Sequence, residues 1–205
     1  MSEQDTGLRA RLIDAGVELV NTEGAQALSL REIARQAGVS HGAPRRYFPT
    51  HLELLSAIAR RGFAELADRA ERTMATTTAP GGPREQLAAL SRAYLDFALT
   101  RRGMFELMFR HDLLESNQLG LRETSLPLFA LLADLVTRAR RNPSTDSATG
   151  TDPAPSAVVA AALWANLHGI AQLWLWGSLP LAAGLDDIEP LLQAALDAHL
   201  GPVRR

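Results

Sequence analysis

The sequence predicts an all-α fold for this 205-residue chain, and three observations support the prediction. Ala and Leu dominate the 46% of residues that are apolar, while β-branched and aromatic residues are few, which favours helix along most of the chain. Apolar residues recur with the period of a helix in one segment after another. Two capping-box sequences also mark residues where helices begin.

The first predicted element is a long helix that ends just before Gly24. A capping box beginning at Ser29 then opens a second helix, with Ser29 as the cap and Glu32 reaching back to it. That helix is expected to stop at Gly38, where a left-handed conformation costs little. The apolar face of the first helix has the i, i+3, i+4, i+7, i+8 spacing and comprises Leu12, Ala15, Gly16, Leu19 and Val20.

The third and fourth helices are expected to follow closely. Room remains for one short helix from about Ser40 to Tyr47, with Ser40 as its cap and Pro44 in its first turn, where a proline is tolerated. A second capping box begins at Thr50 and opens a fourth helix over about residues 51–73. The sequence MATTTAPGGP that comes next predicts a turn-rich connection.

Spacing and charge set this N-terminal region apart. Ala34, Gly38 and Val39 have the spacing of a helix-turn-helix, in which a small residue permits close approach, a glycine makes the turn and a branched residue fills the angle. Residues 28–62 hold six Arg against two acidic residues, whereas residues 63–205 hold thirteen Arg against sixteen. Lys is absent, and the planar guanidinium of Arg suits phosphates and guanine edges. A solvated basic face is the alternative interpretation of this charge.

The rest of the chain also predicts helices. One covers residues 87–98, the short piece FELMFRHDLL follows, and amphipathic patterns mark further helices near residues 128–141 and 188–196. RNPSTDSATGTDPAPS is poor in apolar residues and predicts a flexible loop at about residues 141–155.

A further helix is expected from Ala157 to about Gly177, within a stretch from Pro153 to Leu185 that has no charged residue. That length invites a transmembrane interpretation, but the stretch contains Asn166, His168 and Gln172. A helix that is apolar all round is more often buried in protein. We therefore expect it to pack on its own core on one side and on a second copy on the other, with the final helix completing a four-helix dimer interface.

Leu12, Gly24, Ile33-Ala34, Gly38-Val39, Gly42, Tyr47-Phe48 and Leu54-Leu55 occur at spacings that resemble the DNA-binding domain of TetR/AcrR-type bacterial transcriptional regulators. ALWANLHGIAQLWLWG, with Trp164 and His168-Gly169, resembles the Trp-His-Gly (WHG) subgroup of that family. The resemblance implies a three-helix helix-turn-helix DNA-binding domain over residues 1–55, joined by the fourth helix to a helical effector-binding and dimerisation domain over residues 56–205.

The resemblance also implies a function. The chain is expected to be a cytoplasmic regulator that binds a palindromic operator as a homodimer and is released by a small apolar or aromatic effector. Most members of the family are repressors, and the sequence does not distinguish repression from activation. We expect no cofactor, metal site, catalytic residue or membrane contact.

The third helix would enter the major groove, where Arg45 is expected to read a guanine through O6 and N7 together. Arg46 either contacts a phosphate or is solvated, and Tyr47 either binds a phosphate or packs in the core. Ser29 either binds a phosphate or only caps its helix, and His51 stands where the family commonly has Lys. The predicted DNA-binding residues are Ser29, Ser40, His41, Gly42, Arg45, Arg46, Tyr47 and His51.

An apolar effector site is expected between the C-terminal helices. Each of its candidate residues is otherwise a plain core residue, and His168 has three alternatives: core, ligand contact or dimer interface. The candidates are Tyr94, Phe97, Met108, Phe109, Trp164, His168 and Trp174.

Two other classes of function compete with this interpretation. A helical enzyme would use His168 or His111-Asp112, yet no nucleophile elbow, HExxH sequence, phosphate-binding glycine loop or metal-spaced cluster accompanies them. A helical interaction module that does not bind DNA is the other alternative, and the positive charge concentrated in residues 28–62 argues against it.

Overall fold

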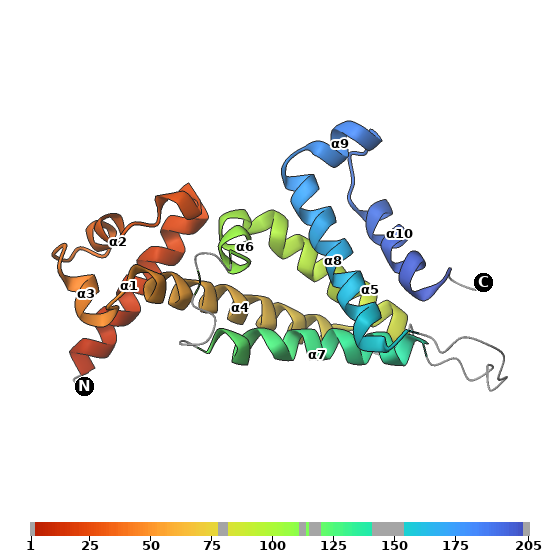
Figure 1. Ribbon diagram of the computed structural model, residues 1–205, viewed down its shortest axis with the longest axis horizontal. Helices are drawn as coiled ribbons and strands as arrows, with labels where there is room; N and C mark the ends of the chain where they lie inside the picture. Colours follow the sequence, from red (N-terminus) through yellow and green to blue (C-terminus); the bar gives the residue numbers. More distant parts are fainter. Residues whose placement is uncertain (1–2, 78–81, 111–113, 115–119, 141–153, 203–205) are drawn as a thin grey trace. The chain divides into compact units, whose positions relative to one another are not determined.

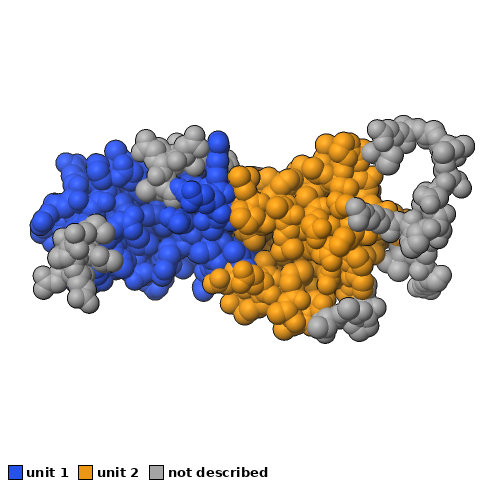
Figure 2. Space-filling model, turned by 90° about the horizontal axis from the view of Figure 1, so that it is seen from below, with its two compact units in different colours: residues 1–67, 100–125 blue, residues 68–99, 126–205 orange. Residues whose placement is uncertain are grey.

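The computed structural model describes residues 3–77, 82–110, 114, 120–140 and 154–202. Every regular element within those ranges is a helix (Figure 1), which confirms the predicted all-α class. The chain divides into two compact units, coloured separately in Figure 2. Unit 1 comprises residues 1–67 and 100–125, and unit 2 comprises residues 68–99 and 126–205.

Unit 1 is built around α1 (Glu3–Glu23), which contacts every short element of the unit. These short elements are η1 (Ala25–Ala27), α2 (Leu30–Gln36), α3 (Ala43–Tyr47) and α6 (Arg102–Met108), and the first part of α4 (His51–Thr76) completes the unit. Gly24 has φ 86° just past α1, as predicted. The fully buried core side chains of unit 1 include Leu12, Leu19, Ile33, Leu54, Ile58 and Phe105.

The start of α2 confirms one half of the predicted capping box. The Glu32 main-chain N–H donates to Ser29 Oγ at 3.2 Å, so Ser29 caps the helix. The prediction that Glu32 reaches back to Ser29 is wrong. The Glu32 carboxylate instead binds Arg35 one turn later, and the Ser29 N–H donates to the Ala27 carbonyl at 2.8 Å.

The third helix is shorter than predicted. It begins at Ala43 rather than Ser40, and Gly42 is its N-cap without any side-chain hydrogen bond. The Ser40 carbonyl instead accepts from the Ala43 N–H at 3.0 Å, which closes a turn before the helix. Pro44 is therefore the second helical residue, where its missing N–H breaks no hydrogen bond within the helix.

α4 begins as predicted and ends later. The Glu53 N–H donates to Thr50 Oγ1 at 3.1 Å, which confirms Thr50 as the cap. The helix continues to Thr76 instead of Thr73, so it includes the first residues of the segment predicted as a connection. Residues 78–81 of that connection lie outside the described residues.

Unit 2 contains the last part of α4, nearly all of α5 (Gly82–Thr100), most of α7 (Leu121–Arg140), and the whole of α8 (Ser156–Leu175), α9 (Ser178–Ala183) and α10 (Glu189–Leu200). α8 contacts both α9 and α10. Ion pairs Arg84–Asp197 and Arg92–Glu189 join α5 to α10. The buried side chains of the unit include Leu87, Leu95, Leu135, Val136, Leu163, Leu167, Leu192 and Leu196.

α9 was not predicted, because six residues between two glycines are too few to show a helical period. Gly177 and Gly184 flank it with φ 75° and φ 63°, in the left-handed region that favours glycine. The predicted flexible loop falls almost entirely on residues 141–153, which lie outside the described residues.

α8 has one buried side and one exposed side. By length and composition this helix could cross a membrane, and 28% of its apolar stretch is buried in the protein. Ala160, Leu163, Leu167, Ile170 and Ala171 are buried along one side. The opposite side leaves apolar side chains exposed, among them Val158, Trp164, Leu173 and, just beyond the helix, Trp176.

Candidate functional site

The predicted DNA-contacting residues around α3 lie on its exposed side. His41, Gly42, Arg45 and Arg46 are all exposed, and Tyr47 is half-buried. Ala43, Pro44 and Phe48 are buried on the other side. This short segment therefore presents two adjacent guanidinium groups from a backbone that its apolar residues anchor.

Hydrogen bonds along the chain fix the turn between α2 and α3. The Val39 N–H donates to the Ala34 carbonyl at 3.0 Å, and the Gly38 N–H donates to the Arg35 carbonyl at 3.2 Å. Gly38 has φ 67°, as the helix-turn-helix spacing predicted. α3 is thus held in one orientation before any partner binds.

Two arginines of α1 add a brace that the sequence did not reveal. The Arg11 guanidinium donates to the Ala37 carbonyl at 2.6 Å, at the end of α2. The Arg9 guanidinium lies 4.9 Å from the centre of the Phe48 ring, at the end of α3. These contacts join residues far apart in sequence, so neither periodicity nor local motifs could identify them.

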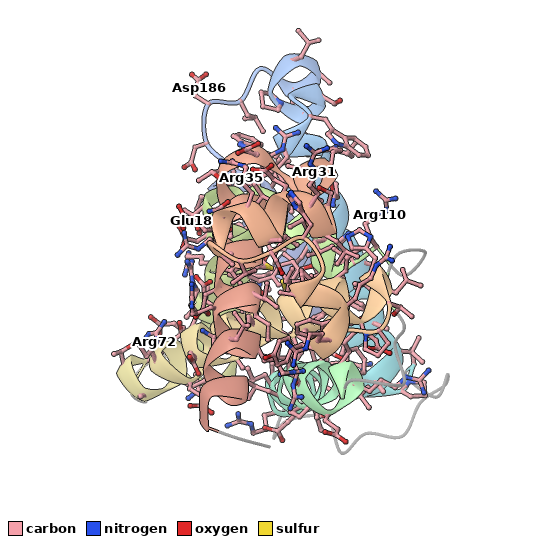
Figure 3. All side chains as sticks on the ribbon, turned by 90° about the vertical axis from the view of Figure 1, so that its left-hand side faces the viewer. Glu18, Arg31, Arg35, Arg72, Arg110 and Asp186 are labelled. Carbon is pink, nitrogen blue, oxygen red and sulfur yellow. The ribbon has the colours of Figure 1, made fainter. Side chains whose placement is uncertain are left out.

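Pairing changes the distribution of positive charge on α2. Arg31 and Arg35 both project from this helix (Figure 3). Arg35 is bound to Glu32, which raises the pKa of Arg35 and lowers the pKa of Glu32 through their hydrogen bond. Arg31 is exposed and has no such partner among the described residues. Arg31 is therefore a further candidate phosphate contact, which counting charges along the sequence did not single out.

The two predicted contacts farthest from α3 in the sequence, Ser29 and His51, differ in accessibility. Ser29 is exposed, and its hydroxyl oxygen is engaged in the α2 cap. His51 is half-buried at the start of α4, and its Nε2 atom is buried without a hydrogen-bond partner among the described residues. A direct phosphate contact from the His51 ring would therefore have to use Nδ1.

In unit 2, three of the predicted effector residues form one hydrogen-bonded cluster. Trp164 Nε1–H donates to the Tyr94 hydroxyl oxygen at 3.2 Å, and that hydroxyl lies 2.9 Å from His168 Nδ1. An indole N–H only donates, so the phenolic oxygen accepts from Trp164 and its own proton is available to His168. When the Tyr94 hydroxyl donates to Nδ1, the proton of a neutral His168 is on Nε2.

Burial keeps the cluster uncharged. It raises the pKa of Tyr94 far above its ordinary value, against a smaller opposite effect of the Trp164 hydrogen bond. Burial also lowers the pKa of His168. The Phe129 ring meets Trp164 edge-on, with centroids 6.3 Å apart. The Tyr94–Trp164–His168 cluster is thus a neutral polar site with one further aromatic ring, Phe129, against Trp164.

The other predicted effector residues lie elsewhere. Phe97 is fully buried in unit 2, with the Arg69 guanidinium 5.2 Å from its ring centre, and Trp174 is half-buried near the end of α8. Met108 and Phe109 belong to unit 1, where Phe109 meets Phe63 and Phe105 edge-on at 5.8 Å and 5.1 Å. His111 and Asp112, the alternative catalytic pair, lie outside the described residues. Within the described ranges, no group of three His, Asp or Glu side chains could hold a metal ion.

The half-buried His168 predicts a loss of stability in acid. Because its pKa is lower in the folded chain than the ordinary 6.5, the unfolded chain takes up a proton first as the pH falls. The free energy of unfolding should therefore decrease below about pH 6.5, down to the lowered pKa. Urea unfolding at neutral and mildly acidic pH should show a smaller decrease for His168→Asn than for the wild type. His199→Asn is the control, and an unchanged pH dependence in His168→Asn would contradict the prediction.

Comparison with known proteins gives two family matches. Residues 12–58 match the family described as bacterial regulatory proteins, tetR family, and residues 87–199 match the tetracyclin repressor-like C-terminal domain. The second match covers more than half of the chain. These matches show the TetR family and this C-terminal domain, and they do not show the finer WHG subgroup.

Individual relatives agree with these matches. The chain is 37% identical over 84 residues to the HTH-type transcriptional regulator BetI of Rhizobium meliloti, an alignment that covers 41% of this chain and 40% of BetI. The chain thus spans half or less of the length of the curated relatives it matches. A solved protein of unknown function from Rhodococcus sp. RHA1 is 30% identical, with TM-score 0.74, over 94% of this chain and 93% of that one. RolR, solved with resorcinol, is 19% identical with TM-score 0.65, over 97% and 90% of the two chains, and shows the fold alone.

Proposed function

The chain belongs to the TetR family of helix-turn-helix transcriptional regulators, and from that premise we propose that it is a cytoplasmic repressor that binds a palindromic operator as a homodimer. A small apolar or aromatic effector would release it. DNA binding is assigned to residues 1–55, and effector binding and dimerisation to residues 56–205. The observation that carries the proposal is the exposed Arg45–Arg46 pair on the braced α3.

Arg45 is the proposed reader of a guanine. A guanidinium presents two parallel N–H donors, which match the O6 and N7 acceptors of guanine in the major groove. His41 and Gly42 precede α3 at the end that a recognition helix directs to the bases, and Gly42 brings no side chain between backbone and DNA. Phosphate contacts are assigned to the rest of the predicted set: Ser29, Ser40, Arg46, Tyr47 and His51.

Arg45→Ala should weaken operator binding by about 1–3 kcal/mol and relax the preference for one base pair in each half-site. Fluorescence anisotropy would compare a footprinted fragment of the upstream region with random DNA of the same length, at one fixed salt concentration. Arg35→Ala is the matched control, because Arg35 is also exposed but is neutralised by Glu32. Equal losses for Arg45→Ala on specific and random DNA would contradict base reading and leave only a phosphate contact.

The exposed side of α8 supports the proposed homodimer. Val158, Ala162, Ala165, Gly169 and Leu173 recur at helical spacing along this side, and the stretch from Pro153 to Leu185 has no charged residue. A Cβ atom at Gly169 would meet no atom within 4 Å, so a second helix could approach closely at this point. Two copies of α8 and α10 would form a four-helix interface. The dimer would set its two α3 segments about 34 Å apart, the distance between successive major grooves.

The Tyr94–Trp164–His168 cluster supports an effector with one polar group on an aromatic or apolar body. Its neutral groups offer hydrogen bonds and its rings offer apolar surface. Resorcinol, which RolR was solved with, is a molecule of this kind.

Repression would be tested by transcription from the footprinted promoter, with and without the protein. A screen of phenols and other small aromatics for release of the operator would test the effector class.

A further inference from the structure

Unit 2 has a groove that the proposed function does not use. It is open, has a volume of about 530 Å³, and lies between the last turns of α4 and the middle of α5. The Tyr94–Trp164–His168 cluster does not line it. The lining residues are Arg69, Arg72, Thr73, Thr76, Ala89, Arg92, Ala93 and Asp96.

Small side chains account for the hollow. Ala89 and Ala93 of α5 line it opposite Thr73 and Thr76 of α4. The Thr73 hydroxyl donates to the Arg69 carbonyl at 2.8 Å, and the Thr76 hydroxyl donates to the Arg72 carbonyl at 3.0 Å. Since both protons are used within the helix, these threonines contribute methyl groups and oxygen lone pairs. The groove therefore has largely apolar small side chains between its charged residues.

Two of the three arginines are held in place by carboxylates. Arg69 donates to Asp96 at 2.7 Å. Arg92 binds Glu189 of α10, with Nε at 2.9 Å from one carboxylate oxygen and one amino group also engaged. This pair leaves the second amino group of Arg92 without a hydrogen-bond partner among the described residues. The paired arginines are thus fixed, and Arg92 keeps donor capacity.

Arg72 is the arginine of this groove that no carboxylate binds among the described residues. It is exposed on α4 (Figure 3) and its guanidinium has no hydrogen-bond or ion-pair partner in the described part of the chain. Three guanidinium groups line the groove, and carboxylates bind two of them: Asp96 binds Arg69 and Glu189 binds Arg92. The three arginines gather here although acidic residues outnumber arginines by sixteen to thirteen in residues 63–205.

We propose that this groove binds a small organic anion, at a site separate from the effector cluster. Arg72 and the second amino group of Arg92 bind its phosphate or carboxylate group, because charge-assisted bonds from guanidinium to oxyanions are strong and directional. Ala89 and Ala93 contact its apolar part. Binding there does not require the chain to bind DNA or an aromatic effector.

Calorimetric titration of the full chain with phenyl phosphate, benzoate and inorganic phosphate tests the proposal. We expect saturable binding of one phenyl phosphate or one benzoate per protomer in the millimolar range, and whichever of the two binds tighter identifies the oxyanion. Inorganic phosphate should bind more weakly than phenyl phosphate, because it has no apolar part to contact the two alanines. No saturable binding of either organic anion would overturn the proposal.

Variants then locate the anion. Arg72→Gln should weaken anion binding at least about tenfold. Arg61→Gln is the control, because Arg61 is exposed on the same helix but lies outside the groove, and it should leave anion binding unchanged. Ala93→Leu fills the groove and should weaken the binding of the organic anions more than the binding of inorganic phosphate. Equal affinities of Arg72→Gln and Arg61→Gln would overturn the proposal. A loss only in Arg45→Ala would also overturn it, because it would place the anion on unit 1.

Discussion

Replacing Gly103 with alanine is expected to lower the free energy of unfolding by about 3 kcal/mol, at the upper end of the range for overpacked sites. A Cβ atom at this position of α6 would overlap the carbonyl oxygen of Val20 in α1 and would lie 3.2 Å from Gly24 Cα. Both obstacles belong to the main chain, so no side-chain rotation relieves them. α6 would have to move away from α1 and open the core around Phe105.

Urea unfolding followed by far-ultraviolet circular dichroism measures this effect. Gly7→Ala is the control, because Gly7 also lies in a helix and a Cβ atom there would meet nothing within 4 Å. That substitution should be neutral or stabilise the fold by up to about 1 kcal/mol. A Gly103→Ala variant as stable as the wild type would show that α1 and α6 are not packed at this distance.

Replacing Gly169 with arginine is expected to convert the proposed dimer to monomers, with a rise of at least about a thousandfold in the dissociation constant, or roughly 4 kcal/mol. In one chain the new side chain has open space at its Cβ, and arginine is the better helix former by about 1 kcal/mol. In the dimer, the same guanidinium would be buried without a carboxylate between two uncharged helices. The folded monomer therefore tolerates the change and the interface does not.

Analytical ultracentrifugation of Gly169→Arg measures the oligomeric state, and circular dichroism confirms that the monomer stays helical. Ala75→Arg adds the same charge at an exposed position of α4 and should remain dimeric. Operator affinity should fall together with the dimer, since each monomer reads only one half-site. A dimer that survives in Gly169→Arg would exclude this side of α8 as the interface.

Features fixed by neighbouring residues were predictable from the sequence. The end of α1 at Gly24, the caps Ser29 and Thr50, and the left-handed Gly38 each depend on a few adjacent residues, and all were confirmed. The start of α3 was placed wrongly at Ser40. A serine before a short helix fits a cap by pattern, but here its carbonyl closes a turn and the helix begins after Gly42.

Features that join distant parts of the chain were not predictable. The brace from Arg9 to Phe48 and from Arg11 to Ala37 needs α1 beside α2 and α3. The contact of Gly103 with Val20 needs α6 beside α1. Aromatic content along the C-terminal half suggested one effector set, yet Phe109 lies with Phe63 and Phe105 in unit 1. Composition identifies apolar side chains without indicating which core each one enters.

The position of the tryptophans has a practical consequence for observing this protein. All three, Trp164, Trp174 and Trp176, belong to unit 2, and unit 1 has none. Intrinsic indole emission is therefore an optical signal from unit 2 alone. Because the Trp164 indole bonds Tyr94 and lies edge-on to His168, a molecule that enters this cluster should change the emission without any added dye. Binding of DNA at α3 should leave the same emission unchanged unless the signal is passed from one unit to the other.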